Sequence, residues 1–203
     1  MRVKGPNPIE ALPTPSNPFL GAYLQAMHLK RLFRQGWLKR GVSEANCESV
    51  ADHSFGVALL ALTAPSAAEA AGFPFDRGRA VLLAVVHELG EVYAGDITPV
   101  DGVSKEEKSR RERESMERVI ADLENGTATM LRSLWEEFEA ETSREARFVR
   151  ELDRLEMGIQ AAVYKAEGHP RMDEFLESAD KAVKSDALRS MLRSAEAAAA
   201  GKL

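Results

Sequence analysis

The stretch VLLAVVHELGEVYAGD, residues 81 to 96, decides which fold the sequence predicts. Its first six residues are all apolar, which indicates a helix buried on every side. Asp76 can cap the start of this helix and Gly95 can end it. We therefore predict a buried helix that carries the polar residues of HELGEVY into the interior.

Apolar residues recur at helical spacing along most of the chain, whereas strand signals are nearly absent. Further helices are predicted to begin at Asn17, Glu48, Ser104, Thr127, Ser143 and Met172. The first helix is expected to bury Leu20, Leu24, Met27 and Leu32 on one face. The helix after Ser143 is expected to bury Phe148, Leu152, Leu155, Ile159 and Ala162.

These patterns predict an all-α protein, a single compact helical bundle. Residues 1 to 16 contain four prolines and read as a flexible arm, so the domain is placed at residues 17 to 203. With 203 residues, of which 44% are apolar and 29% charged, the chain has the composition of a globular protein with a core.

The charge, the cysteine count and the apolar runs exclude several classes of protein. A formal charge of −5 gives no basic excess, so nucleic acid binding is not the expected task. The single cysteine, Cys47, rules out an intrachain disulfide and suggests a reducing compartment. No apolar run reaches the roughly 18 residues that span a bilayer. We therefore expect a cytoplasmic protein with no membrane partner.

Two of the four histidines lie in apolar helices, His53 in VADHSFG and His87 in VVHELGE. A buried histidine alone is more often a hydrogen-bonded core residue than a metal ligand. Glu88, however, also follows an apolar run, and a buried carboxylate without a partner is costly. Glu91 is expected one turn beyond His87 on the same helix face.

Asp153, in RELDRLEMG, lies beside the predicted core face of the late helix. Alone it reads as a surface residue. Together with His53, His87 and Glu88 it completes a set of two nitrogen and two oxygen ligands. Such a set suits manganese, cobalt, iron, zinc or nickel better than a metal that prefers thiolates.

Other kinds of catalytic site lack their motifs. The zinc-protease motif HExxH would need histidine where Glu91 stands, and no glutamate has a histidine three residues later, as di-iron bundles require. The nucleophile motif GxSxG and a glycine-rich phosphate loop are both absent from the sequence.

The segments VADHS, VVHELGEVYAGDITPVD, KEEK and RELDRLEMGIQA resemble the HD-domain phosphohydrolases, in particular their 5′-deoxynucleotidase branch. The resemblance covers roughly residues 20 to 165. It implies an all-helical fold, a homodimer, a single divalent metal ion and a nucleotide substrate. The expected activity is release of phosphate from deoxynucleoside 5′-monophosphates. The alternatives are hydrolysis of nucleoside triphosphates or other small phosphate esters, and a non-catalytic binding protein with a degenerate metal site.

The resemblance also implies roles for particular residues. By position, the metal ligands are His53, His87, Glu88 and Asp153. The catalytic carboxylates are Glu91 and Asp96. The phosphate-binding arginine falls on Arg34 after a one-residue shift, with Arg31 and Arg40 as competitors.

One position departs from the family pattern, because the pair that is His-Asp in the family is His87-Glu88 here. The extra methylene adds about 1.3–1.5 Å of reach. It can keep the site with a shifted metal, change the preferred metal or weaken the site. Dinuclear relatives use further histidines between this pair and the final aspartate, and none occurs between His87 and Asp153. A mononuclear hydrolase is therefore expected.

Overall fold

A computed structural model describes residues 1–12 and 15–201, and about 68% of the chain is helical. The predicted all-α fold class is confirmed, since no strand is present among these described residues. The predicted arm at 1–16 includes Pro13 and Thr14, and the predicted domain includes Lys202 and Leu203. These four residues lie outside the described part, and the boundary at residue 17 stays a prediction.

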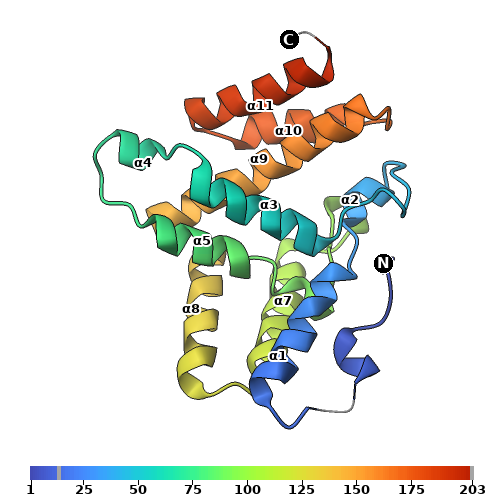
Figure 1. Cartoon of the computed structure of the whole chain (residues 1–203), viewed down its shortest axis with the longest axis vertical. Coiled ribbons are helices and arrows are strands. Elements are labelled where there is room, and N and C mark those ends of the chain that lie inside the picture. The colour runs from blue at the N-terminus through green and yellow to red at the C-terminus, as the bar shows by residue number, and fades with distance from the viewer. Residues whose placement is uncertain (13–14, 202–203) are drawn as a thin grey trace. The chain divides into compact units, whose positions relative to one another are not determined.

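Figure 1 traces the helices in chain order from blue to red. The chain divides into two units, each built from segments that are distant in sequence. The first unit consists of Met1–Lys39, Ser43–Ser54 and Val86–Glu136. The second consists of Arg40–Val42, Phe55–Val85 and Glu137–Leu203. None of the described helices is long and apolar enough to cross a membrane.

The first unit places short helices around a longer one. Its elements are η1 (Pro8–Ala11), α1 (Pro18–Ala26), η2 (Met27–Lys30), α2 (Gln35–Leu38), α6 (Glu91–Ala94), η3 (Pro99–Asp101) and α7 (Lys105–Ile120), with most of α8 (Asn125–Ala140) and the start of α3 (Val50–Thr63). Both α1 and α6 pack on α7. Their shared core contains Leu29, Leu32, Val50, Val92, Met116, Val119, Ile120 and Trp135.

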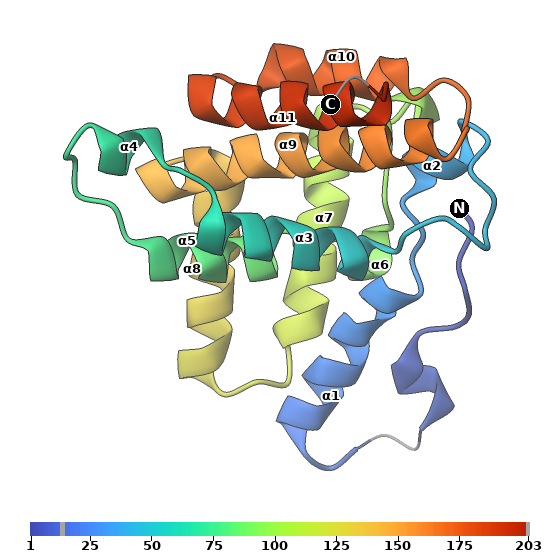
Figure 2. The ribbon, with the colours of Figure 1, turned by 45° about the horizontal axis from the view of Figure 1, so that its top comes forward.

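The second unit is organised along the longest helix, α9 (Arg144–Ala166). It also contains the rest of α3, α4 (Ala67–Ala70), α5 (Arg77–Val86), α10 (Asp173–Ala182) and α11 (Asp186–Ala199). Figure 2 shows α10 and α11 lying along α9, and both pack on it. At Gly158 a Cβ would lie 2.7 Å from both Ala179 Cβ and Leu192 Cδ1, so this close approach requires glycine.

Several local predictions are confirmed. The side chains of Asn17, Asp76 and Ser104 each accept a hydrogen bond from a backbone N–H of the helix that follows. The late helix buries most of its predicted core face: Phe148, Leu152, Leu155 and Ala162 are buried, and Ile159 is partly buried.

The first helix differs from its prediction. Helix α1 ends at Ala26, and after η2 the chain forms isolated bridges from Leu32 to Val3 and from Phe33 to Ser49. The helical period therefore does not continue from Leu20 to Leu32. Leu32 is fully buried, whereas Leu20 is 45% exposed, and the expected shared core face is wrong.

Candidate metal centre

The helix that was predicted to run through residue 94 is interrupted at His87 and Glu88. Helix α5 ends at Val86 and α6 begins at Glu91. Between them the backbone makes shorter-range bonds, from Leu89 N to Val86 O at 3.0 Å and from Glu91 N to Glu88 O at 2.9 Å. His87 and Glu88 therefore lie on a tight turn, and the expected i to i+4 relation between His87 and Glu91 on one helix is wrong.

Gly90 lets the turn pack closely on its neighbours. A Cβ at this position would lie 3.0 Å from Glu112 Cβ and 3.2 Å from Trp135 Cζ2. The turn thus packs directly on α7 and α8, and a side chain here would require Glu112 and Trp135 to shift by a few tenths of an ångström. This contact is tertiary and leaves no periodic pattern in the sequence.

The turn brings two imidazoles and one carboxylate together. His53, near the start of α3, and His87 are both buried. The Nε2 atom of each lies 3.6 Å from Glu88 Oε1. The two rings meet edge to face, with centroids 5.5 Å apart. The candidate ligand atoms of these three side chains lie within 4.8 Å of one another.

This geometry fits a divalent cation. Two ligand atoms that each lie 2.0–2.2 Å from a shared ion, at an angle of 90–110°, are roughly 2.8–3.6 Å apart. The 3.6 Å separations match that range and are longer than an ordinary hydrogen bond. Two imidazole nitrogens and a carboxylate oxygen are ligands that zinc, manganese, cobalt, nickel and iron accept. The residues present therefore fit a metal ion.

Glu91, at the start of α6, is buried beside this cluster, and its Oε2 atom makes no hydrogen bond. Burial raises the pKa of Glu91 well above its ordinary value, and the negative charges of Glu88 and Asp96 raise it further. Arg34 and Lys108 act in the opposite direction. A carboxyl group with a raised pKa can give and take a proton near neutral pH.

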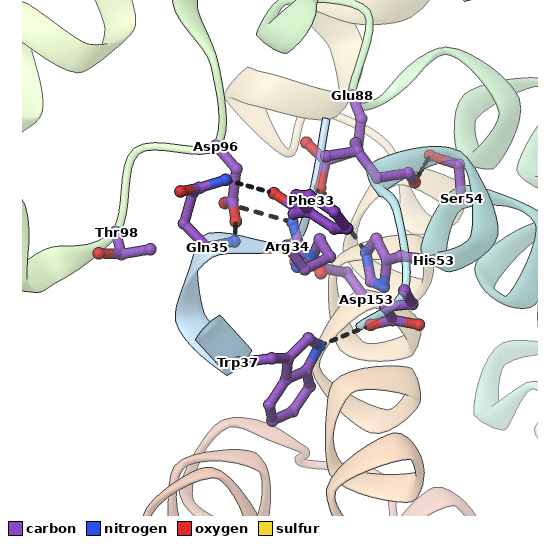
Figure 3. Close-up of polar contacts among 12 residues, drawn as sticks. Phe33, Arg34, Gln35, Trp37, His53, Ser54, Glu88, Asp96, Thr98 and Asp153 are labelled. Carbon is purple, nitrogen blue, oxygen red and sulfur yellow. Dashed lines mark hydrogen bonds and ion pairs between the residues drawn. The ribbon is translucent and has the colours of Figure 1, made fainter. Parts of the chain in front are cut away.

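Arg34, from another segment of the first unit, pairs with both Glu88 and Asp96 (Figure 3). Arg34 Nη1 donates a hydrogen bond to Glu88 Oε1 at 3.1 Å and lies 3.5 Å from Asp96 Oδ1. The backbone N–H of Gln35 donates to Asp96 Oδ2 at 2.5 Å. Asp96 follows Gly95, whose φ of +79° is a conformation that favours glycine.

The competing arginines make contacts elsewhere. Arg31 Nη1 donates to the carbonyl of Pro6 at 2.5 Å. Arg40 belongs to the second unit and pairs with Glu174 at 2.7 Å. Of the three candidates, Arg34 is the one that lies beside Glu88 and Asp96.

Asp153 lies on α9, in the second unit. It is buried next to Leu152, and Arg154 Nε lies 3.7 Å from its Oδ2. The surface location that Asp153 would have on its own is therefore wrong. Its role as a metal ligand stays a prediction from the family resemblance.

Sequence reasoning missed Lys39, which holds the loop after Asp96. Lys39 Nζ lies 2.6 Å from both carboxylate oxygens of Asp101 and 2.7 Å from Thr98 Oγ1. Thr98 and Asp101 also form a capping box around η3. Hydrogen bonds from Lys39 and then Thr98 lower the pKa of Asp101 to about 2.

We expect Asp101→Asn to lower the midpoint of thermal unfolding at pH 6 but not at low pH. The folded pKa of about 2 lies below the ordinary value of 3.8. The carboxylate therefore stabilises the fold above about pH 3.8, and this contribution disappears as the pH falls through 2. Thermal unfolding of both proteins from pH 6 downward measures the difference. A difference that stays constant below pH 4 would contradict the interpretation, and Asp122→Asn, at an exposed aspartate, is the control.

Comparisons with known proteins agree with this geometry. A family model described as HD domain matches residues 26–193. The chain is 42% identical over 154 residues to a protein of Danio rerio named 5′-deoxynucleotidase HDDC2, covering 75% of this chain and 73% of that protein. It is 39% identical over 152 residues to the Homo sapiens protein of the same name, covering 74% and 71%.

Solved structures show the same fold. The PH0347 protein from Pyrococcus horikoshii OT3 superposes with a TM-score of 0.72 at 33% identity, covering 87% of this chain and 98% of that chain. A protein from Magnetospirillum magnetotacticum MS-1, titled a predicted metal-dependent phosphohydrolase, superposes with a TM-score of 0.65 at 25% identity. That match covers 91% of this chain and 92% of the other.

Proposed function

The chain belongs to the HD-domain family and is a metal-dependent phosphohydrolase, and from this we propose that it is a 5′-deoxynucleotidase. Its reaction would be hydrolysis of the phosphate ester of deoxynucleoside 5′-monophosphates. The observation that carries the proposal is the convergence of His53, His87 and Glu88 on one point beside Arg34. A cation and a guanidinium placed together form a site for a phosphoryl group.

We propose that His53, His87, Glu88 and Asp153 hold one divalent cation. The buried imidazoles and Glu88 offer their ligand atoms at distances that suit a shared ion. The donor set accepts manganese, cobalt, nickel, iron or zinc. When bound, such a cation would lower the pKa of a coordinated water and offset phosphoryl charge.

The remaining residues have roles that follow from their chemistry. Arg34 presents five N–H donors, so it can hold a phosphoryl oxygen while it stays paired with Glu88 and Asp96. Glu91, with its raised pKa, would transfer the proton between the attacking water and the reacting phosphate. Asp96, fixed by the Gln35 N–H, would orient the water or protonate the leaving 5′-oxygen.

A substrate panel tests the proposed activity. We expect metal-supplied protein to release phosphate from deoxynucleoside 5′-monophosphates faster than from the matching ribonucleotides. Release of pyrophosphate or triphosphate from nucleoside triphosphates would favour that alternative, with the same residues in the same roles. Equal rates on every phosphate ester would contradict a deoxynucleotide preference.

We also propose that the protein is a homodimer that associates through α3 and α5. Arg77, at the start of α5, donates to the carbonyls of Ala61 and Ala64 near the end of α3, so the two helices are joined there. Both helices expose apolar side chains at helical spacing: Phe55, Leu59, Leu62, Leu82 and Val85. These side chains are each at least 50% exposed, and exposed apolar side chains gathered on one surface mark interaction sites. A standard interface buries about 800 Å² per partner.

Leu59→Glu is expected to convert the dimer to a monomer, because it places a charge at the centre of the α3 stripe. Light scattering after size-exclusion chromatography measures the mass directly. Met130→Glu, at an equally exposed apolar residue of α8, should leave the dimer intact. A wild-type protein that is monomeric at micromolar concentration would overturn the proposal. A cytoplasmic location stays a prediction from the cysteine count.

A further inference from the structure

The N-terminal residues Arg2 to Pro6, here called the strap, lie along the segment that leads to Arg34. Lys4 N donates to the carbonyl of Arg31 at 2.7 Å, and Val3 forms an antiparallel bridge with Leu32. Arg31 in turn donates its Nη1 to the carbonyl of Pro6. The strap is thus attached at both ends to the segment that presents the proposed phosphate-binding arginine.

Gln35 is the residue that joins the strap to the site. Its side chain is buried, with 4% of the residue exposed. Oε1 accepts from Arg2 N at 3.0 Å, while Nε2 donates to Arg2 O at 2.8 Å and to Phe33 O at 2.9 Å. Both N–H donors and the oxygen of the Gln35 side-chain amide therefore make hydrogen bonds to main-chain groups.

The backbone of the same residue holds Asp96, because the Gln35 N–H donates to Asp96 Oδ2 at 2.5 Å. Figure 3 shows Gln35, the first residue of α2, beside Asp96. The N-terminal residues also reach the chain just before Asp96, since a Cβ at Gly95 would overlap the Met1 side chain. Movement of Gln35 would therefore displace the hydrogen-bond donor on which the Asp96 carboxylate rests.

We propose that Gln35 is a positioning residue, which uses the strap to fix its own backbone and thereby orients the Asp96 carboxylate. The inference rests on the proposed function, in which Asp96 acts on the water or the leaving oxygen. Small displacements of an oriented group are costly in rate. The effect should appear in kcat, because the orientation of Asp96 matters in the transition state and little in substrate binding.

Gln35→Met tests this role, since methionine has a similar length but makes no amide hydrogen bonds. We expect kcat to fall about tenfold with KM changed less than about twofold, in folded protein with its metal content intact. Gln25→Met is the matched control, because Gln25 is a buried glutamine of the same unit that accepts from the Tyr93 hydroxyl. It should lose some stability and keep its kcat. An unchanged kcat in Gln35→Met would overturn the proposal.

Arg2→Pro tests the strap separately, because it removes the N–H that donates to Gln35 Oε1. It should lower kcat less than Gln35→Met, and the double variant should be no slower than Gln35→Met alone. Effects that multiply would show that the strap and Gln35 act independently and would overturn the proposed coupling.

Hydrogen exchange separates a failure of this inference from a failure of the proposed function. The amides of residues 33 to 37 should exchange faster in Arg2→Pro than in wild type. Unchanged exchange would overturn the strap's role, whatever the enzyme hydrolyses. Wild-type protein that releases no phosphate with any metal would refute the 5′-deoxynucleotidase proposal and, with it, the catalytic part of this inference.

Discussion

His87→Ala is expected to lose the bound metal ion and to lower kcat/KM at least about 100-fold. Mutation of a residue that only hydrogen-bonds to a metal ligand already lowers metal affinity or activity by about 10–100-fold. His87 Nε2 lies 3.6 Å from Glu88 Oε1, and the imidazole is buried on the turn between α5 and α6. Alanine would remove one of the proposed nitrogen ligands. Metal content after purification and phosphate release should fall together.

His169→Ala is the matched control for this variant. His169 follows α9 and has Glu167, 3.8 Å from its Nε2, as a neighbour. It should keep both metal and activity. Retention of a full complement of metal by His87→Ala, with activity near that of wild type, would contradict the assignment of His87 as a ligand.

Glu91→Gln is expected to lower kcat by about 10²–10⁴, the range for removal of a general acid–base group. Glutamine has nearly the same shape but cannot transfer a proton at neutral pH. Because the pKa of Glu91 is raised by burial and by the charges of Glu88 and Asp96, the neutral amide should be tolerated in the fold. The metal content should stay at the wild-type value, which distinguishes this variant from His87→Ala.

Glu112→Gln controls for loss of a buried carboxylate in the same unit, where Glu112 lies 3.4 Å from Lys108 Nζ. It should change stability more than kcat. If Glu91→Gln retained more than about a tenth of the wild-type kcat, Glu91 would not be the main proton-transfer group, and Asp96 would take that role.

Features that depend on neighbouring residues in the chain could be predicted from the sequence. The caps at Asn17, Asp76 and Ser104 are local hydrogen bonds, and the core face of α9 follows one uninterrupted helical period. The break after Val86 could not be predicted, because no local residue pattern marks it and the contacts of the turn with Glu112 and Trp135 are tertiary.

The candidate site could likewise be predicted from the sequence only in part. His53, His87 and Glu88 stand out in the sequence because they are polar residues within apolar segments. The choice among the three arginines needed the structure, since the chain leaves the helix before Arg34. Gln35 was missed because it acts through backbone hydrogen bonds, which have no residue signature.

The glutamate in place of the family's aspartate has a structural basis here. Glu88 Oε1 lies 3.6 Å from both histidine Nε2 atoms and accepts a hydrogen bond from Arg34 at 3.1 Å. A single carboxylate oxygen of Glu88, on the tight turn, thus lies near both imidazoles and the guanidinium. This arrangement favours a retained metal site over a degenerate one.

The most direct test of a metal-dependent phosphohydrolase at this site is phosphate release by metal-stripped protein during titration with manganese, cobalt or nickel. With a deoxynucleoside 5′-monophosphate as substrate, we predict no activity before the addition. Activity should then rise to a plateau at one bound ion per chain and disappear again on chelation. Release that is unaffected by stripping, or absent with every metal in folded protein, would contradict the account.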